Sequence, residues 1–234
     1  MTCAARSRCR DAKADRRAAR SANVEDLVPG REERTAAVGV AENGNSAVLV
    51  TVARDGELLD RRRIDLTRGL PTHPYHHEGA WAVGRYLNSA WARPISLGEA
   101  VALIKRVHEA AAQGAHESLG ELATSVRVRI TRVSIRVCPE LPPTIEDRIA
   151  DNRAQVVADS VMYREALATA AKARGWSVYW YDREDVFAAA ATSIGCEDVG
   201  AFLTAMGRSI GPPWQAKHRL AAAAALAAAR VPAR

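Results

Sequence analysis

Three β-strand patterns joined by short turns occupy residues 35–66 and limit the folds that this chain can adopt. Apolar residues dominate Thr35–Glu42 and Ala47–Ala53, and the turn-forming tripeptide Asn43-Gly44-Asn45 separates them. Asn-Gly between two apolar runs is typical of a β-hairpin, because both residues tolerate positive φ. The turn Arg54-Asp55-Gly56 then leads to Leu58–Leu66, whose many charged residues are typical of an edge strand. We therefore expect an antiparallel meander of three strands at the start of the fold.

The rest of the chain alternates helical and strand patterns. Helical periodicity dominates from Ala80 to about Thr124, and Ser96 and Glu99 within this stretch form a capping-box pattern. The other expected elements are a strand over Arg129–Cys138, a helix over Ala154–Arg174, a strand over Ser177–Tyr181, and helices over Asp185–Ile194, Asp198–Met206 and Gln215–Arg230. Strands separated by helices pair in parallel, because a helical crossover returns the chain to its starting end. The order predicts an α/β protein with a mixed sheet, in which two parallel strands follow three antiparallel ones.

Composition and charge limit the classes of protein and partner. The chain has 234 residues, of which 48% are hydrophobic and 26% charged, and this suits one folded domain. Residues 1–34 contain nine Lys or Arg and six Asp or Glu, without an aromatic residue or a sustained apolar period. They predict a mobile basic arm or an extension from an upstream start codon, and residues 35–234 predict a single domain. The net charge of +6 makes nucleic acid a reasonable partner, although half of it lies in this arm.

No segment has the composition of a membrane span or of a secretory signal. The apolar run Leu220–Ala229 is too short and too rich in alanine to cross a bilayer. The basic N-terminus lacks the apolar core of a signal peptide. The four cysteines lack the spacing of a zinc ribbon, and a reducing compartment fits them. We expect a cytoplasmic protein without membrane contact.

The element order resembles that of the ribonuclease H-like superfamily, most closely its branch of Holliday-junction resolvases. In that branch the first strand ends in an acidic residue followed by a glycine turn, the fourth strand ends in a second acidic residue, and the last helix supplies the remaining ligands. The matching segments here are Gly39-Val40-Ala41-Glu42-Asn43-Gly44, Val137-Cys138-Pro139-Glu140, and Lys217-His218 before the alanine run Ala221–Ala225. The resemblance covers about residues 35–230. It implies a metal-dependent nuclease that acts on DNA or RNA, and it is compatible with a homodimer.

The resemblance also implies divalent ions, Mg²⁺ or Mn²⁺, held by carboxylates at the ends of adjacent strands. Two such ions about 4 Å apart activate water and stabilise the leaving oxygen in phosphodiester hydrolysis. Glu140 has the required position, with pairing to a nearby arginine, such as Arg136 or Arg148, as its structural alternative. Aligning Gly39 with the family's glycine places Ala41 where the family has aspartate, so Glu42 is one residue late and points to the opposite face. Either Glu42 reaches the site from the strand end or a bulge, or the first ligand is lost, and the catalytic pattern is degenerate.

The start of the last helix and the start of the long central helix offer further candidates. No Asp or Glu follows Gln215, so His218 is expected to act as a ligand or proton donor there, unless it is a packed or capping histidine. Lys217 stands at the same helix N-terminus, where free amides favour anions. Lys217, Arg148 and Arg153 are therefore the expected phosphate contacts, with solvated charges as the structural alternative.

A loop rich in histidine follows the third expected strand. His73, His76, His77 and Glu78 lie within six residues, and this loop holds half of the chain's histidines. Imidazole is both a common metal ligand and a side chain suited to proton transfer near neutral pH. We expect His76, His77 and Glu78 to act as additional or substitute metal ligands if the loop folds over the sheet edge that bears Glu140. If the loop lies elsewhere, its histidines are expected to hydrogen-bond to backbone carbonyls.

These residues leave three classes of function open. The first is a metal-dependent nuclease that acts through Glu42, Glu140 and His218. The second is a ribonuclease H-like module without the metal site, which binds nucleic acid or another protein. The third is a hydrolase that uses the histidine loop on a small substrate. Convergence of the candidate residues on one site would favour the first class, and scattered residues would favour the second.

Overall fold

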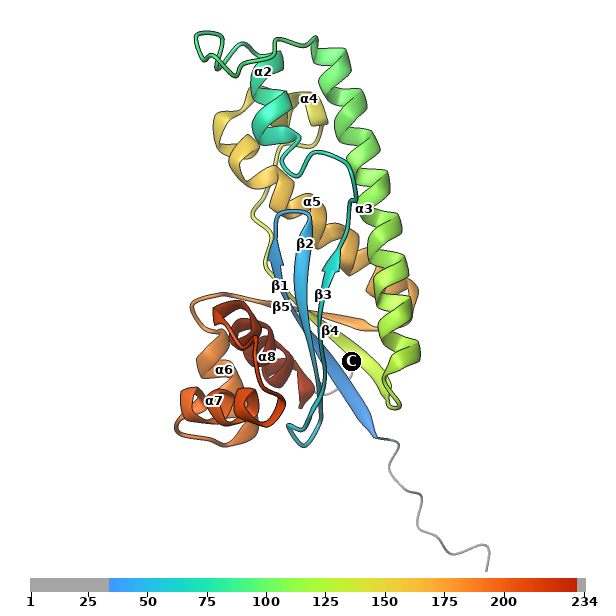
Figure 1. The fold of residues 1–234 in the computed structure, drawn as a ribbon, viewed down its shortest axis with the longest axis vertical. Coiled ribbons are helices and arrows are strands. Elements are labelled where there is room, and N and C mark those ends of the chain that lie inside the picture. The colour runs from blue at the N-terminus through green and yellow to red at the C-terminus, as the bar shows by residue number, and fades with distance from the viewer. Residues whose placement is uncertain (1–33, 231–234) are drawn as a thin grey trace, which may run out of the picture. The chain divides into compact units, whose positions relative to one another are not determined.

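The computed structural model describes residues 34–230, which belong to one compact unit (Figure 1). The arm predicted over residues 1–34 lies outside the described residues except for Arg34. In chain order the elements are β1 (Thr35–Asn43), β2 (Ser46–Ala53), β3 (Leu58–Asp65), the π-helical turn η1 (Tyr75–Gly79), α2 (Ala80–Ala82), α3 (Leu97–Ser125), β4 (Arg129–Arg136), α4 (Ile145–Ala150), α5 (Asn152–Ala173), β5 (Ser177–Tyr181), α6 (Val186–Ile194), α7 (Val199–Ile210) and α8 (Ala216–Ala229).

One mixed sheet forms the centre of the fold. Its five strands have the order β3-β2-β1-β4-β5. β1, β2 and β3 pair antiparallel, whereas β4 pairs parallel with β1 and β5 pairs parallel with β4. The hairpin between β1 and β2 closes where Asn43 pairs with Ser46, and Gly44 in its turn has a φ of 58°. The sheet and its flanking helices confirm the predicted fold class, an α/β arrangement in which three antiparallel strands are followed by two parallel ones.

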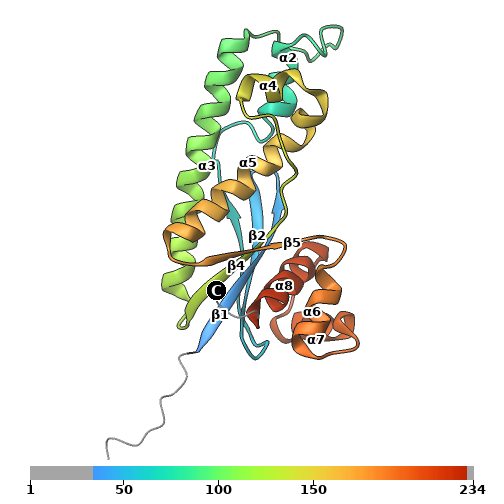
Figure 2. The same ribbon diagram turned by 180° about the vertical axis from the view of Figure 1, so that it is seen from behind.

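Helices cover both faces of the sheet (Figure 1 and Figure 2). Val38 and Val40 of β1 belong to the larger core cluster, which includes residues of α3 and α5, whereas Ala41 belongs to the cluster around α8. α8 lies very close to β1, because a Cβ on Gly39 would be only 1.8 Å from the backbone oxygen of Ala221. Glycine on the strand and alanine on the helix therefore bring the two backbones into contact.

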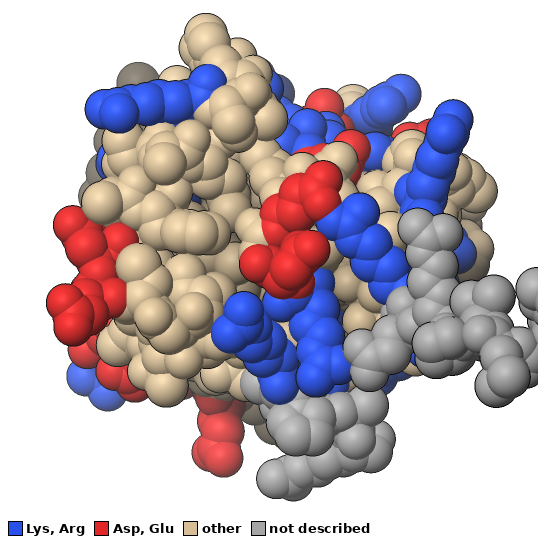
Figure 3. Space-filling model, turned by 90° about the horizontal axis from the view of Figure 1, so that it is seen from below, with Lys and Arg blue, Asp and Glu red and all other residues tan. Residues whose placement is uncertain are grey.

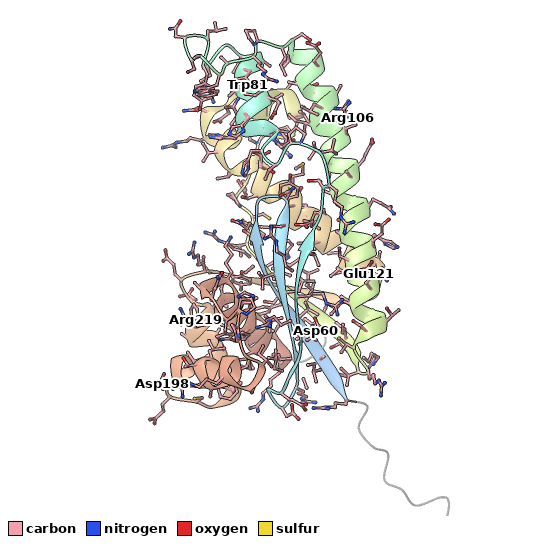
Figure 4. The ribbon with its side chains drawn as sticks, in the orientation of Figure 1. Asp60, Trp81, Arg106, Glu121, Asp198 and Arg219 are labelled. Atoms are coloured by element: carbon pink, nitrogen blue, oxygen red, sulfur yellow. The ribbon has the colours of Figure 1, made fainter. Side chains whose placement is uncertain are left out.

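The helices α6 and α7 pack beside α8. Asp198 caps α7 by accepting the N–H of Ala201 at 2.8 Å, and it lies in this layer in Figure 4. Val186, Ala190, Leu203 and Met206 are buried side chains that join these helices to the cluster around α8. Among the described helices, none is by itself long and apolar enough to cross a membrane, although α6 and α7, bent by 81°, meet the requirement of length and composition together.

Several elements differ from those that the sequence predicts. Helix was expected from Ala80 onward, but α2 ends within one turn, and Gly84 then takes a φ of 73° that no right-handed helix contains. The strand expected to reach Cys138 ends at Arg136, before the proline-rich stretch. The short helix α4 was not predicted. It begins where the side chain of Thr144 accepts the N–H of Asp147.

We predict that Gly39→Ala lowers the free energy of unfolding by about 1–3 kcal/mol or more, because the added methyl group would overlap the backbone of α8. Urea denaturation measures the change. Gly98→Ala is the matched control, since the closest atom to its Cβ would be 4.0 Å away and the position is helical. The control should be neutral or slightly stabilising. Equal effects of the two substitutions would contradict the close approach of α8.

Candidate functional site

Glu42 forms a buried ion pair at the end of β1. Arg164 of α5 donates to its Oε1 from Nε at 2.8 Å and also from Nη2. The side chain of Arg164 is 7% exposed and that of Glu42 is 9% exposed, so the pair is largely shielded from water. Nη1 of Arg164 donates to the carbonyl oxygen of Val137 at 2.9 Å. One guanidinium thus joins the ends of β1 and β4 to α5.

The face of β1 on which Glu42 lies explains this partner. Successive strand residues point to opposite faces, and Ala41 packs in the cluster around α8. Glu42 therefore points to the face covered by α5, where Arg164 is located. The sequence places Glu42 one residue after the position of the family's aspartate, and this offset also moves its side chain to the opposite face of β1.

A cavity of about 340 Å³ lies beside Glu42 at the ends of the parallel strands, where open α/β sheets commonly bind ligands. We call it the basic cavity. Its lining residues are Ala41, Glu42, Arg136, Arg183, Phe187, Ala216, Lys217 and Leu220. Three of them are cationic, and they come from the end of β4, the segment after β5 and the first turn of α8. Glu42 is the one acidic residue of this lining within residues 34–230, and Arg164 neutralises it.

Lys217 connects the start of α8 to the end of β1. Its Nζ donates to the backbone carbonyl oxygen of Glu42 at 3.4 Å. Burial lowers the pKa of Lys217 below its ordinary value. Glu42 acts in the opposite direction, while the positive charges of Arg183 and Arg63 lower this pKa further. The amine of Lys217 is therefore held among other cations in a partly dehydrated place.

Three cations give the basic cavity its positive charge. On the face seen in Figure 3, basic and acidic side chains are interspersed and do not form one continuous basic surface. Asp182, Glu184 and Asp185 flank Arg183 in the sequence, but they do not belong to the lining of the basic cavity. An anion in this cavity is thus attracted by its three cations.

Glu140 and His218 are not part of the lining of the basic cavity. Glu140 is exposed after the end of β4. His218 takes part in the cap of α8, where its Nδ1 accepts the backbone N–H of Gln215 at 3.1 Å. Its ring stacks on Trp214, with ring centroids 5.9 Å apart. Burial lowers the pKa of His218, and the charge of Arg61 lowers it further.

The two arginines predicted to contact phosphate lie near α4 and at the start of α5. Arg148 is half-buried, and its Nε donates to the carbonyl oxygen of Pro142 at 2.7 Å. Arg153 is exposed and follows Asp151, whose side chain caps α5. Neither arginine lines the basic cavity.

The histidine loop is fastened to α5 by a buried carboxylate. Asp159 accepts the backbone N–H of Tyr75 at 2.9 Å and that of His76 at 3.1 Å. Burial raises the pKa of Asp159 from 3.8 to about 7. The two N–H donors lower it and the nearby charge of Glu78 raises it. The carboxylate thus holds the backbone of the loop in place.

The histidine side chains lie against each other and against the hairpin between β1 and β2. The ring centroids of His73 and His77 are 5.6 Å apart, and those of His76 and His77 are 5.4 Å apart. A Cβ on Gly44 would be 3.3 Å from the ring of His73, so the loop reaches the hairpin turn. No residue of this loop belongs to the lining of the basic cavity, and Trp81, which follows the loop and is labelled in Figure 4, is part of α2.

The residues present do not fit a pair of divalent ions. Within residues 34–230, no group of three or more His, Cys, Asp or Glu side chains is arranged to hold a metal ion. The carboxylate of Glu42 is already paired, and an ion that took it would leave the enclosed Arg164 without its counter-charge. The structure does not bring the predicted ligands Glu42, Glu140, His76, His77 and Glu78 together as such a group.

Sequence reasoning missed Arg164, and it treated Arg136 only as a possible ion-pair partner. A signal for Arg164 was present, since it stands at helical spacing from Val161 and Leu167 and therefore on the apolar side of the long helix. A charged residue at such a position requires a buried partner. The position of Arg136 at the end of β4 and that of Arg183 shortly after β5 were the corresponding signal for the basic cavity.

Comparisons with known proteins found similarity among solved structures only. No family model matches the chain, and no curated protein matches it. Among solved structures, RuvC of Thermus thermophilus in complex with Holliday junction substrate is 16% identical, with 82% of this chain and 91% of that chain covered and a TM-score of 0.45. A second structure of RuvC from Thermus thermophilus is also 16% identical, with 82% and 92% covered and a TM-score of 0.42. 

We predict that Arg164→Met destabilises the fold by about 3–5 kcal/mol, because Glu42 is then a buried carboxylate without a partner. The double variant Glu42→Leu/Arg164→Met should recover most of this loss, since neither charge remains. Urea denaturation of the single and double variants measures the coupling. Arg153→Met, at an exposed position of the same helix, should change stability by less than about 0.5 kcal/mol. A single variant as stable as the control would contradict the buried pair.

We predict that Asp159 makes the protein less stable as the pH rises. The raised pKa means that the folded state binds this proton more tightly than the unfolded chain does, so the contribution is complete below about pH 4 and is lost as the pH rises through about 7. Relative to Asp159→Asn, the wild type should lose up to about 4 kcal/mol over this range. Thermal unfolding at a series of pH values measures the difference. Asp185→Asn, at an exposed position, should keep the pH profile of the wild type.

Proposed function

We propose that this protein is a ribonuclease H-like module that binds the phosphate backbone of nucleic acid at the basic cavity and does not cleave it through metal ions. One observation carries the proposal. At the end of β1 the carboxylate of Glu42 is neutralised by Arg164, while Arg136, Arg183 and Lys217 line the adjoining cavity. A site that has lost its free carboxylate and gained cations suits a phosphate group and not a divalent ion.

The surroundings of the basic cavity support phosphate as its ligand. Lys217 stands in the first turn of α8, where backbone N–H groups at a helix N-terminus favour anions. Within the described residues, neither Arg136 nor Arg183 forms an ion pair with an acidic side chain, so both guanidinium groups can contact a ligand. Phe187 is 37% exposed at the same cavity and offers a ring on which an unpaired base can stack.

Salt-dependent binding tests this proposal. Fluorescence anisotropy with labelled single-stranded, duplex and four-way-junction DNA and with RNA should show affinity that falls linearly with the logarithm of salt concentration. Lys217→Gln and Arg183→Gln should each weaken binding to all these ligands and reduce the salt slope by about 0.7–0.9, because each removes one phosphate contact.

A matched control and a cleavage assay complete the test. Arg219→Gln changes an exposed arginine of α8 that lines a different depression and lies in the layer of α6, α7 and α8 in Figure 4. It should leave binding close to that of the wild type. Binding that does not respond to Lys217→Gln or Arg183→Gln would overturn the basic cavity as the contact. Cleavage with Mg²⁺ or Mn²⁺ that is lost in Glu42→Gln or Glu140→Gln would instead support the metal-dependent nuclease.

A further inference from the structure

We propose that Lys217 is a site of acyl modification, at which its amine takes an acyl group from an acyl phosphate bound by Arg136 and Arg183. All three residues line the basic cavity, whose volume of about 340 Å³ accommodates a small organic phosphate. The structure thus places a nucleophilic nitrogen and two phosphate-binding groups around one space.

Lys217 differs from the other lysines of the described chain in its surroundings. Lys105 on α3 and Lys172 on α5 are both exposed, and neither lines the basic cavity. Lys217 is half-buried, with its Nζ 3.4 Å from the carbonyl oxygen of Glu42. A hydrogen bond donated to this carbonyl orients the nitrogen and leaves the lone pair of the neutral amine available to a ligand in the cavity.

The electrostatic environment increases the share of the reactive form. Only the neutral amine attacks an acyl carbon. Burial lowers the pKa of Lys217, and the charges of Arg183 and Arg63 lower it further, while Glu42 opposes them. At any pH below the pKa of an ordinary lysine, the neutral fraction of Lys217 is therefore larger than that of an ordinary lysine.

The chemical step is balanced without an oxidant or a reductant. Nζ of Lys217 attacks the acyl carbon of the acyl phosphate, a C–N bond forms, and the C–O bond to the phosphoryl group breaks. Inorganic phosphate leaves with the electron pair of that bond, and the nitrogen releases one proton to water. Arg136 and Arg183 hold the phosphoryl oxygens throughout, so they also stabilise the charge on the leaving group.

Acylation would switch off the proposed contact with nucleic acid. The modified side chain carries no positive charge and occupies part of the cavity that a backbone phosphate would enter. This consequence rests on the proposed function, whereas the reactivity of Lys217 does not. The modification would therefore regulate the same site.

Incubation of the full-length protein with acetyl phosphate tests the reactivity. Mass spectrometry should find initial acetylation at Lys217 about tenfold faster than at Lys105 or Lys172, since a bound donor is held next to the amine. Excess inorganic phosphate should reduce this preference, and Arg183→Gln should abolish it. Arg219→Gln should leave it unchanged. Equal rates at the three lysines, or a preference that persists in Arg183→Gln, would overturn the proposal.

A second measurement separates this inference from the proposed function. Anisotropy with labelled single-stranded DNA should show weaker binding after acetylation of the wild type. Lys217→Arg, which keeps the charge but is not acetylated, should bind and should be insensitive to the same treatment. If the unmodified protein does not bind nucleic acid, the proposed function fails while selective acetylation stands. If it binds and Lys217 is not selectively acetylated, only the present inference fails.

Discussion

A single buried guanidinium holds together the end of the sheet at which the basic cavity lies. Arg164 contacts the carboxylate of Glu42 and the carbonyl oxygen of Val137, and it thereby joins two neighbouring strand ends to α5. Because both charges are enclosed, removing either one leaves the other in a place where water cannot solvate it. The cationic character of the cavity follows, since the one acidic residue in its described lining is already paired with Arg164.

The contact between β1 and α8 positions the other side of the cavity. Gly39 has no side chain and Ala221 has a small one, so the helix backbone lies directly on the strand. α8 therefore begins beside the end of β1, and its first turn brings Lys217 to the carbonyl oxygen of Glu42. The missing side chain of Gly39 and the small side chain of Ala221 thus allow the close packing of β1 and α8. This packing places Lys217 in the same cavity lining as two arginines from other elements.

Local patterns predicted most of the fold because they agree with the sheet topology. The hairpin at Gly44 and the capping box at Ser96 are both present as expected. The differences arise where one local interaction outweighs the average pattern. The positive φ of Gly84 accompanies the end of the short α2, and the hydrogen bond from the N–H of Asp147 to the side chain of Thr144 starts α4. Neither effect can be predicted from helical periodicity alone.

The sequence by itself determined the order of the elements and the face of β1 on which Glu42 lies, because both depend on residues that are close in the chain. Only the tertiary structure decided what Glu42 meets there. Its partner Arg164 is 122 residues away in the sequence. The helical pattern around Arg164 does not predict which strand end its side chain will contact. The cations of the basic cavity likewise come from three separate elements. Long-range packing therefore decided that this strand end holds a paired carboxylate beside a basic cavity, where the sequence left open whether Glu42 is a metal ligand or this ligand is lost.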